Sequence, residues 1–177
     1  MSNIETPRVW VGCLACYNNG NLVGRWMEVD ELEDELTPAS VGCRNTSEVS
    51  PCEELWIFDH DGFCGLVKGE PSFDEAIRAV EALRSIETSL PHLPVEVVVE
   101  WLDDRGSDLD SLDELCDRAI YSGESVIDIA QEFAEQTDSI PDRLWSYIDW
   151  EHYAREMFAY DYSEYRYDGV TYLISDC

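Results

Sequence analysis

Two runs of β-forming residues, 8–17 and 22–29, open the chain and are separated by a short polar stretch. That stretch contains Asn19-Gly20, and both residues accept the positive φ angles of a two-residue hairpin turn. The pattern therefore predicts an antiparallel hairpin. A short acidic helix over 30–36 and a third strand over 54–58 follow, so we expect a small antiparallel sheet with one helix, ending near Pro71.

Between residues 72 and 119 the apolar positions recur at helical spacing. Ser72 and Glu75 have the spacing of a capping box, in which each residue satisfies a free backbone N–H group of the other. Residues 95–102 fit a strand by their valine content and a helix by their spacing behind a proline, and we favour the helix. Ser111 and Glu114 repeat the capping-box spacing and predict another helix.

The last third combines amphipathic helices with a hairpin. Ser125 and Asp149 are N-cap candidates for two helices, and Pro141 marks the start of a short helix between them. Asp168-Gly169 predicts a C-terminal β-hairpin. The whole pattern predicts an α+β protein of three small domains, 1–71 (α/β with the Asn-Gly hairpin), 72–119 (acidic and helical) and 120–177 (α+β).

Acidic residues far outnumber basic residues: 39 Asp and Glu against 11 Lys and Arg give a formal net charge of −28 over 177 residues. The excess is shared almost equally among the three predicted domains, whereas an acidic tail would concentrate it. Since 45% of the residues are hydrophobic and 11% aromatic, the chain should fold rather than remain disordered. Self-repulsion favours an elongated row of domains, and the surface should repel nucleic acid and membranes but attract basic surfaces built to hold DNA. Salt adaptation is a minor alternative source of the acidity.

The cysteine count is odd, and the N-terminus lacks a basic region followed by an apolar run, so secretion is not expected. We therefore expect reduced, mostly buried thiols in a cytoplasmic protein. A zinc site from Cys13, Cys16, His60 and Cys64 is disfavoured, because residues three apart on a strand face opposite ways. The acidic loops at 59–62 and 103–110 lack the glycine and distal glutamate of a calcium-binding EF-hand. We expect no metal and no cofactor.

Catalytic motifs are likewise missing from the sequence. Its three histidines are scattered, and there is no HExxH spacing, GxSxG elbow or glycine-rich phosphate loop. Carboxylate pairs are expected by chance among so many acidic residues, and a solvated acidic face does not separate their pKa values as acid–base catalysis requires. We therefore expect a protein that is not an enzyme, with a metal-dependent hydrolase as a weaker alternative.

Two segments resemble a known family. Residues 9–29, with the L-A-x-Y-N-x-G core at 14–20 and G-x-W at 24–26, are similar to the opening of the ArdA antirestriction proteins. Residues 144–157 resemble the later Y-[IF]-D-x-E-x-[YF]-[AG]-R block of that family. The resemblance covers nearly the whole chain; departures are the residues before Pro7, the cysteine-containing loop 41–52 and the acidic run 103–117.

The resemblance implies an elongated, curved, three-domain protein that dimerises through its third domain. It implies a DNA mimic that inhibits type I restriction–modification enzymes by occupying the DNA groove of their specificity and modification subunits. Such proteins are carried by mobile genetic elements and act in the cytoplasm. The alternative from the same class is an acidic mimic aimed at a nucleoid or repair protein.

Candidate residues follow from charge and pattern, and from the resemblance. The outward carboxylates expected to form the DNA-mimic surface are Glu31, Glu33, Asp34, Glu35, Asp74, Glu75, Glu81, Asp103, Asp104, Asp108, Asp110, Asp113 and Glu114. The aromatic stripe near the C-terminus suits either a core or a subunit interface. The residues that the resemblance assigns to the dimer contact are Tyr147, Trp150, Tyr153, Ala154 and Phe158.

Overall fold

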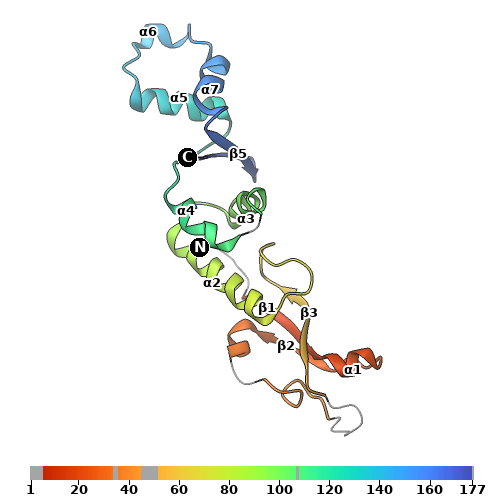
Figure 1. Cartoon of the computed structure of the whole chain (residues 1–177). Coiled ribbons are helices and arrows are strands. Elements are labelled where there is room, and N and C mark those ends of the chain that lie inside the picture. The colour runs from red at the N-terminus through yellow and green to blue at the C-terminus, as the bar shows by residue number, and fades with distance from the viewer. Residues whose placement is uncertain (1–5, 34–35, 45–51, 107, 177) are drawn as a thin grey trace. The chain divides into compact units, whose positions relative to one another are not determined.

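A computed structural model describes residues 6–33, 36–44, 52–106 and 108–176 (Figure 1). The described residues form two three-stranded antiparallel sheets and several helices, which confirms the predicted α+β class. Contacts divide it into two compact units, the N-terminal unit Met1–Pro91 and the C-terminal unit His92–Cys177. The division into three domains stays a prediction.

The N-terminal unit is built on a sheet of order β2-β1-β3. Its strands are β1 (Arg8–Cys13), β2 (Gly24–Glu28) and β3 (Leu55–Asp61). One face of the sheet is apolar and packs with the buried face of helix α2 (Phe73–Ser89). The resulting core includes Val9, Val11, Met27, Ile57, Ala76, Ala79 and Val80.

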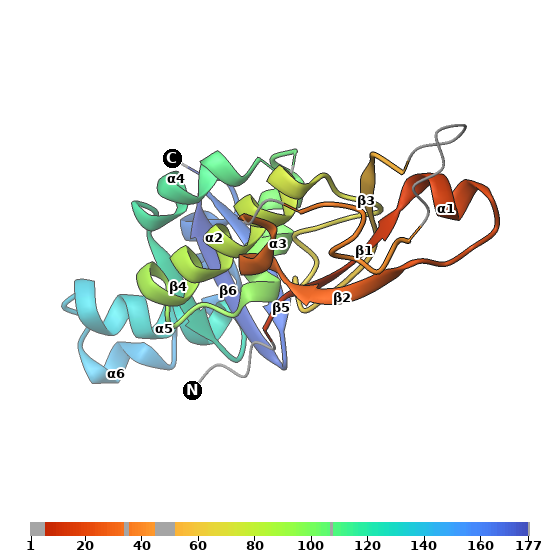
Figure 2. The ribbon, with the colours of Figure 1, turned by 90° about the horizontal axis from the view of Figure 1, so that it is seen from below.

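The β1–β2 pairing is antiparallel as predicted, with Trp10 opposite Trp26. The prediction of a tight hairpin turn at Asn19-Gly20 is wrong. Residues Leu14–Asn18 form a short helix, α1, at the end of β1 (Figure 2). Gly20 has a φ of 78° and ends this helix: its N–H bonds to the carbonyl of Tyr17, and the next N–H bonds to that of Cys16. This is the Schellman arrangement, so the glycine serves as a helix C-cap rather than as a hairpin turn.

Two further elements of this unit differ in extent from the prediction. The acidic helix is a 3₁₀ helix, η1 (Val29–Glu33), whose Leu32 joins the core, and residues 34–35 lie outside the described residues. Strand β3 continues to Asp61 instead of turning at residue 59. An ion pair between Arg8 and Asp61, 2.8 Å between nitrogen and oxygen, joins β1 to the end of β3.

The predicted capping box of α2 is confirmed. The Ser72 hydroxyl accepts a hydrogen bond from the N–H of Glu75 at 3.2 Å, and the Glu75 carboxylate accepts one from the N–H of Ser72 at 2.7 Å. Behind this cap most of the apolar positions are buried as far as Ile86, and the acidic positions of α2 are exposed.

The C-terminal unit is built on a sheet of order β4-β6-β5. Its strands are β4 (Ile120–Gly123), β5 (Tyr162–Tyr167) and β6 (Val170–Ser175). The β5–β6 hairpin is confirmed: Asp168 and Gly169 both have positive φ, 47° and 78°. The short strand β4 is not predicted from the sequence, and its pairing with β6 makes β6 the buried central strand.

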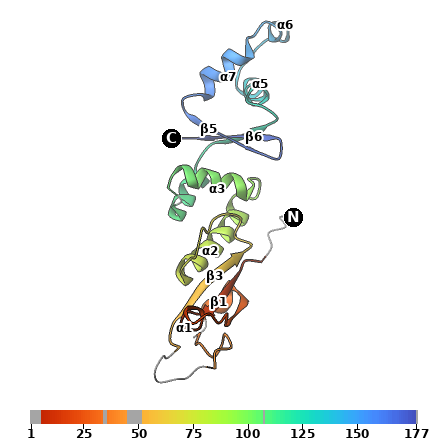
Figure 3. The same ribbon diagram turned by 90° about the vertical axis from the view of Figure 1, so that its right-hand side faces the viewer.

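Helices cover both faces of this sheet. Figure 3 shows α3 (Val95–Asp104) on one side of β5 and β6, and α5 (Val126–Thr137) with α7 (Trp150–Phe158) on the other. The helix over 95–102 is therefore confirmed, and Ser125 and Asp149 cap α5 and α7 as predicted. A short helix, α6 (Asp142–Trp145), follows Pro141.

The second predicted capping box, at Ser111, is wrong. Asp108 accepts a hydrogen bond from the N–H of Asp110 at 3.1 Å and starts a 3₁₀ turn, η2 (Leu109–Ser111), that leads directly into α4 (Leu112–Cys116). Ser111 therefore has helical backbone angles and makes no capping hydrogen bond. Within the described residues, no helix is both long and apolar enough to cross a membrane.

Candidate functional site

Nine of the thirteen predicted acidic surface residues are exposed in the structure. Glu31 is half-buried, Asp34 and Glu35 lie outside the described residues, and the side chain of Glu33 is likewise not described. The remaining candidates are all exposed: Asp74, Glu75, Glu81, Asp103, Asp104, Asp108, Asp110, Asp113 and Glu114. They fall into two groups, one on α2 and one that begins at the end of α3.

The negative charge of the α2 group is partly offset by arginines. Arg78 and Arg84 lie on the same exposed face as the acidic residues, and Arg84 forms a 2.8 Å ion pair with Asp30 of η1. A helix of this length spans roughly 25 Å, over which duplex DNA carries about 15 negative charges. This helix alone does not match a phosphate row.

The group that begins at the end of α3 is much denser, and we call it the acidic segment, residues 103–117. All of its carboxylates are exposed: Asp103, Asp104, Asp108, Asp110, Asp113, Glu114 and Asp117. The start of the segment is held by the sheet, because the Tyr165 hydroxyl of β5 donates a hydrogen bond to Asp104 at 3.0 Å. The charges therefore occupy a short, folded stretch over the end of α3, η2 and α4.

The two arginines of the acidic segment and its border are turned inward. The guanidinium of Arg105 lies 4.1 Å from the centroid of the Trp101 ring and bonds to Asp176 at 3.0 Å. Only 18% of the Arg118 side chain is exposed, and it reaches Glu114 at 3.6 Å. Because both cations are used within the fold, the outer surface of the segment is almost purely negative.

Sequence reasoning missed Asp117 and the role of Arg105. The signal for Arg105 was present, since Trp101 precedes it by one helical turn, the spacing at which side chains on a helix meet. Asp117 follows α4 directly and belongs to the same acidic run.

Hydrogen bonds hold several carboxylates of the N-terminal unit in their charged form. Arg25 lowers the pKa of Glu31, Arg8 lowers that of Asp61, and the Ser72 backbone lowers that of Glu75. A general acid needs the opposite shift, a pKa raised toward neutrality. These groups therefore suit permanent negative charge rather than proton transfer.

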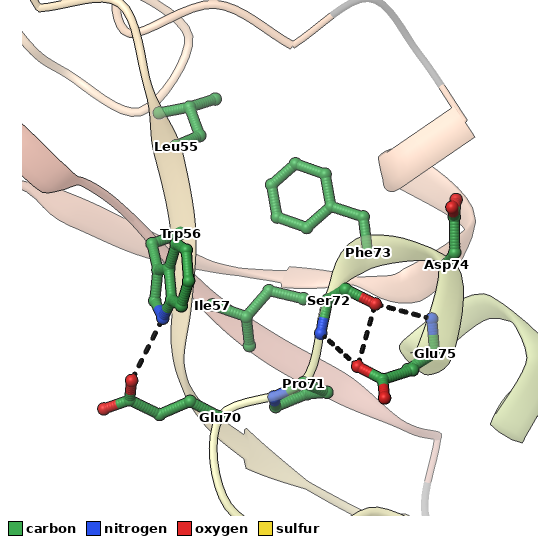
Figure 4. A pocket seen from close by; sticks show the side chains of 9 residues that line it. All are labelled: Leu55, Trp56, Ile57, Glu70, Pro71, Ser72, Phe73, Asp74 and Glu75. Carbon is green, nitrogen blue, oxygen red and sulfur yellow. Dashed lines mark hydrogen bonds between the residues drawn. The ribbon is translucent and has the colours of Figure 1, made fainter.

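One hollow of this unit offers no catalytic arrangement in its described lining. It is a cavity of about 430 Å³ between β3 and the start of α2 (Figure 4). Its polar groups bond to one another: the Trp56 indole N–H donates to Glu70 at 3.0 Å, and Glu75 is held by Ser72.

The predicted dimer residues divide into core and surface. Ala154 and Phe158 are buried in the C-terminal core with Ile129, Ala130 and Leu173. Tyr153 is half-buried, and its hydroxyl donates to Asp138 at 2.8 Å; burial and this carboxylate raise the pKa of Tyr153 to about 12. Trp150 is half-buried against Trp145, whereas Tyr147 is 84% exposed. Among these five residues, the surface available to a partner is therefore mainly Tyr147 and the outer edges of Trp150 and Tyr153.

Four cysteines meet at one point in the N-terminal unit, and the prediction that Cys13 and Cys16 face opposite ways is wrong. Since β1 ends at Cys13 and Cys16 lies in α1, the chain turns and brings both thiols together with those of Cys43 and Cys52. The four sulfur atoms lie within 4.8 Å of one another. The adjacent Cys43 thiol and burial raise the pKa of Cys16 to about 11. His60 and Cys64, the other partners considered from the sequence, do not belong to this group.

A family model described as "Antirestriction protein (ArdA)" matches residues 9–172. The chain belongs to the ArdA antirestriction protein family. A comparison with curated proteins gave no match. The resemblance stated from the two sequence motifs is thus confirmed over nearly the full length.

Several of the ArdA-like motif residues serve the fold in this structure. Gly20 ends α1, Gly24 lies against the Trp10 ring, Asp149 caps α7 and Ala154 is buried in the core. None of these residues is part of the acidic surface. These four motif residues therefore belong to the scaffold, whereas Tyr147 and Glu151 of the later motif are exposed.

Proposed function

We propose that this protein is a non-enzymatic DNA mimic that inhibits type I restriction–modification enzymes, and that it acts as a homodimer. The observation that carries the proposal is the acidic segment, whose carboxylates are all exposed while Arg105 and Arg118 are turned inward. Membership of an antirestriction family supports a restriction enzyme as the target.

The amount of charge suits a substitute for DNA. Duplex DNA carries about one negative charge per 1.7 Å of its axis, so the chain's net charge matches roughly 48 Å of duplex, or about 14 base pairs. Two chains would match about twice that length. An enzyme that reads a two-part site spanning more than one helical turn would meet a decoy of adequate size.

Inhibition by this mechanism requires no chemical step. Carboxylates take the places of phosphates and bind the Lys and Arg residues that line the target's DNA channel. The anions associated with that channel are released, which favours binding at low salt and weakens it steeply as salt rises. Since the energy is spread over many contacts, loss of a single carboxylate should be tolerated.

A type I restriction assay across a salt series tests the proposal. Added protein should block cleavage at stoichiometric amounts in low salt and lose potency as salt increases. Cleavage that continues unchanged at stoichiometric excess in low salt would refute the proposal. Pull-down from cell extract distinguishes the alternative target class: recovery of a nucleoid or repair protein without restriction subunits would also overturn it.

Charge-removal variants test the acidic segment itself. The triple variant Asp110→Asn, Asp113→Asn, Asp117→Asn should weaken binding about tenfold, because each exposed charge contact contributes roughly 0.2–1 kcal/mol. A matched control removes three exposed charges elsewhere in the same unit, Glu124→Gln, Glu132→Gln, Glu135→Gln. Equal losses in the two triples would show that net charge alone matters and that the segment has no special role.

A further inference from the structure

The cysteine cluster is built from three separate parts of the N-terminal unit. Cys13 ends β1 and Cys16 lies in α1, Cys43 follows the turn at 38–42, and Cys52 precedes β3. The first three are almost completely buried, with exposed fractions of 1%, 7% and 8%, and Cys52 is half-buried. The fold thus brings together four thiols from three segments that are far apart in the sequence.

The sulfur positions match a tetrahedral metal site. Zinc binds thiolate sulfur at about 2.3 Å, so the sulfur atoms of a tetrahedral site are separated by about 3.8 Å. The Cys16 sulfur lies 3.5 Å from that of Cys43 and 3.7 Å from that of Cys52, and the whole set fits within 4.8 Å. A disulfide would bring two sulfur atoms to about 2.05 Å, much closer than these.

A purely apolar cluster explains the arrangement less well. Buried cysteine does behave as a small hydrophobic residue. Here, however, four thiols meet, and the other apolar residues packed against them, within the described part of the chain, are the small Ala15 and Val23. Apolar packing has no requirement for four sulfur atoms, whereas a metal site does.

Backbone hydrogen bonds hold the ligand-bearing segments in place. The N–H of Cys13 bonds to the carbonyl of Val23 at 2.9 Å. The N–H of Leu14 bonds to the carbonyl of Glu54, which joins the end of β1 to the residues after Cys52. The N–H of Cys43 bonds to the carbonyl of Pro38, also at 2.9 Å. The thiols are therefore preorganised by main-chain contacts.

We propose that Cys13, Cys16, Cys43 and Cys52 bind one Zn²⁺ ion in a closed tetrathiolate site. Each thiol gives its proton to solvent on binding, so four protons are released for each ion bound and the site carries two net negative charges. Thiolate ligands in tetrahedral geometry favour zinc among the common divalent ions. The ion would join the turn at 38–42 and the start of β3 to the β1–α1 junction.

The site as proposed is structural. All four ligands come from the protein, which leaves no coordination position for an activated water, whereas catalytic zinc keeps one position open. Stoichiometric metal binding would therefore not favour the hydrolase alternative. A chelator would act on this protein by loosening the N-terminal unit, not by removing a catalytic ion.

Metal analysis of the full-length chain tests the proposal. Protein purified under reducing conditions without chelators should contain one zinc per chain by mass spectrometry of its metals. After zinc removal, addition of Co²⁺ should give the intense sulfur-to-cobalt absorption and the visible bands of a tetrahedral thiolate site. Cys16→Ser and Cys43→Ser should lose bound metal, whereas Cys116→Ser, which changes an exposed cysteine of the other unit, should retain one equivalent.

Several outcomes would overturn the proposal. Wild-type protein can be tested without any variant: if it takes up neither Zn²⁺ nor Co²⁺ under reducing conditions, the proposal is wrong. The proposal is also wrong if the purified protein contains iron with acid-labile sulfide, or if thiol titration shows that the four cysteines form two disulfides. If the serine variants fail to fold, Cys52→His provides the second measurement. This variant replaces the most exposed of the four cysteines with another metal ligand, so the site keeps four ligands. It should still bind one Co²⁺, with weaker sulfur-to-cobalt absorption. An unchanged absorption would show that Cys52 is not a ligand.

Discussion

Gly12 and Gly24 show how single residues set the β1–β2 pairing. They are opposite each other, and the Trp10 ring occupies the space that their missing side chains leave. A Cβ at Gly24 would lie 2.6 Å from the backbone carbonyl oxygen of Val11, which has no freedom to move within the ladder. A Cβ at Gly12 would meet only side chains, chiefly the tip of the Trp10 ring at 2.5 Å.

We predict that Gly24→Ala destabilises the protein by about 1–3 kcal/mol, the usual cost of overpacking, and that Gly12→Ala costs less. The comparison is made by urea denaturation of both variants at one protein concentration. Equal midpoints for the two would mean that the Val11 carbonyl does not constrain this position.

Residue patterns predicted local structure correctly where a pattern is typical of one structure, and failed where the same pattern occurs in several structures. Asp168-Gly169 joins two clear strands and forms the predicted hairpin. Asn19-Gly20 has the same signature, yet its glycine ends a helix, because the chain turns early to bury Cys16. The cysteine cluster was missed for this reason: its spacing only makes sense once Leu14–Asn18 is helical.

At the scale of elements, two serine–glutamate pairs have the same spacing, but only Ser72 and Glu75 form a capping box. Ser72 has extended backbone angles and accepts the N–H of Glu75, whereas Ser111 is already helical because Asp108 starts the turn before it. We predict that Asp108→Ala costs about 1 kcal/mol of unfolding free energy, as does Ser72→Ala, while Ser111→Ala costs almost nothing. Urea denaturation measures all three, and a Ser111→Ala loss equal to that of Asp108→Ala would contradict the assignment.

Strong helical periodicity made α2, α5 and α7 predictable in type and starting residue. Strand β4 was not predictable, because four residues carry no usable period and it forms only by pairing with β6. The acidic surface was found from charge, but the inward turn of Arg105 depends on Asp176, which is 71 residues away. Long-range partners of this kind are absent from any local pattern.

For the whole molecule, the proposed homodimer adds a second acidic surface and so doubles the length of DNA that the assembly can imitate. Tyr153 is a poor residue with which to test it, since its hydroxyl bonds to Asp138 and its ring lies against Trp150, so substitution would disturb the fold. Tyr147 is the better choice, because it is 84% exposed and belongs to the same proposed interface.

We predict that Tyr147→Asp shifts the protein from dimer to monomer, because an interface of two acidic chains would then bury an additional unpaired charge from each chain. Tyr160→Asp is the matched control: Tyr160 is 81% exposed and follows α7, but it lies outside the proposed interface. Sedimentation equilibrium at several concentrations measures both variants, with circular dichroism to verify the fold. The monomer should also require more protein to inhibit a type I enzyme, since it presents about half the length of imitated duplex. A Tyr147→Asp variant that stays dimeric, or a Tyr160→Asp variant that dissociates equally, would place the interface elsewhere.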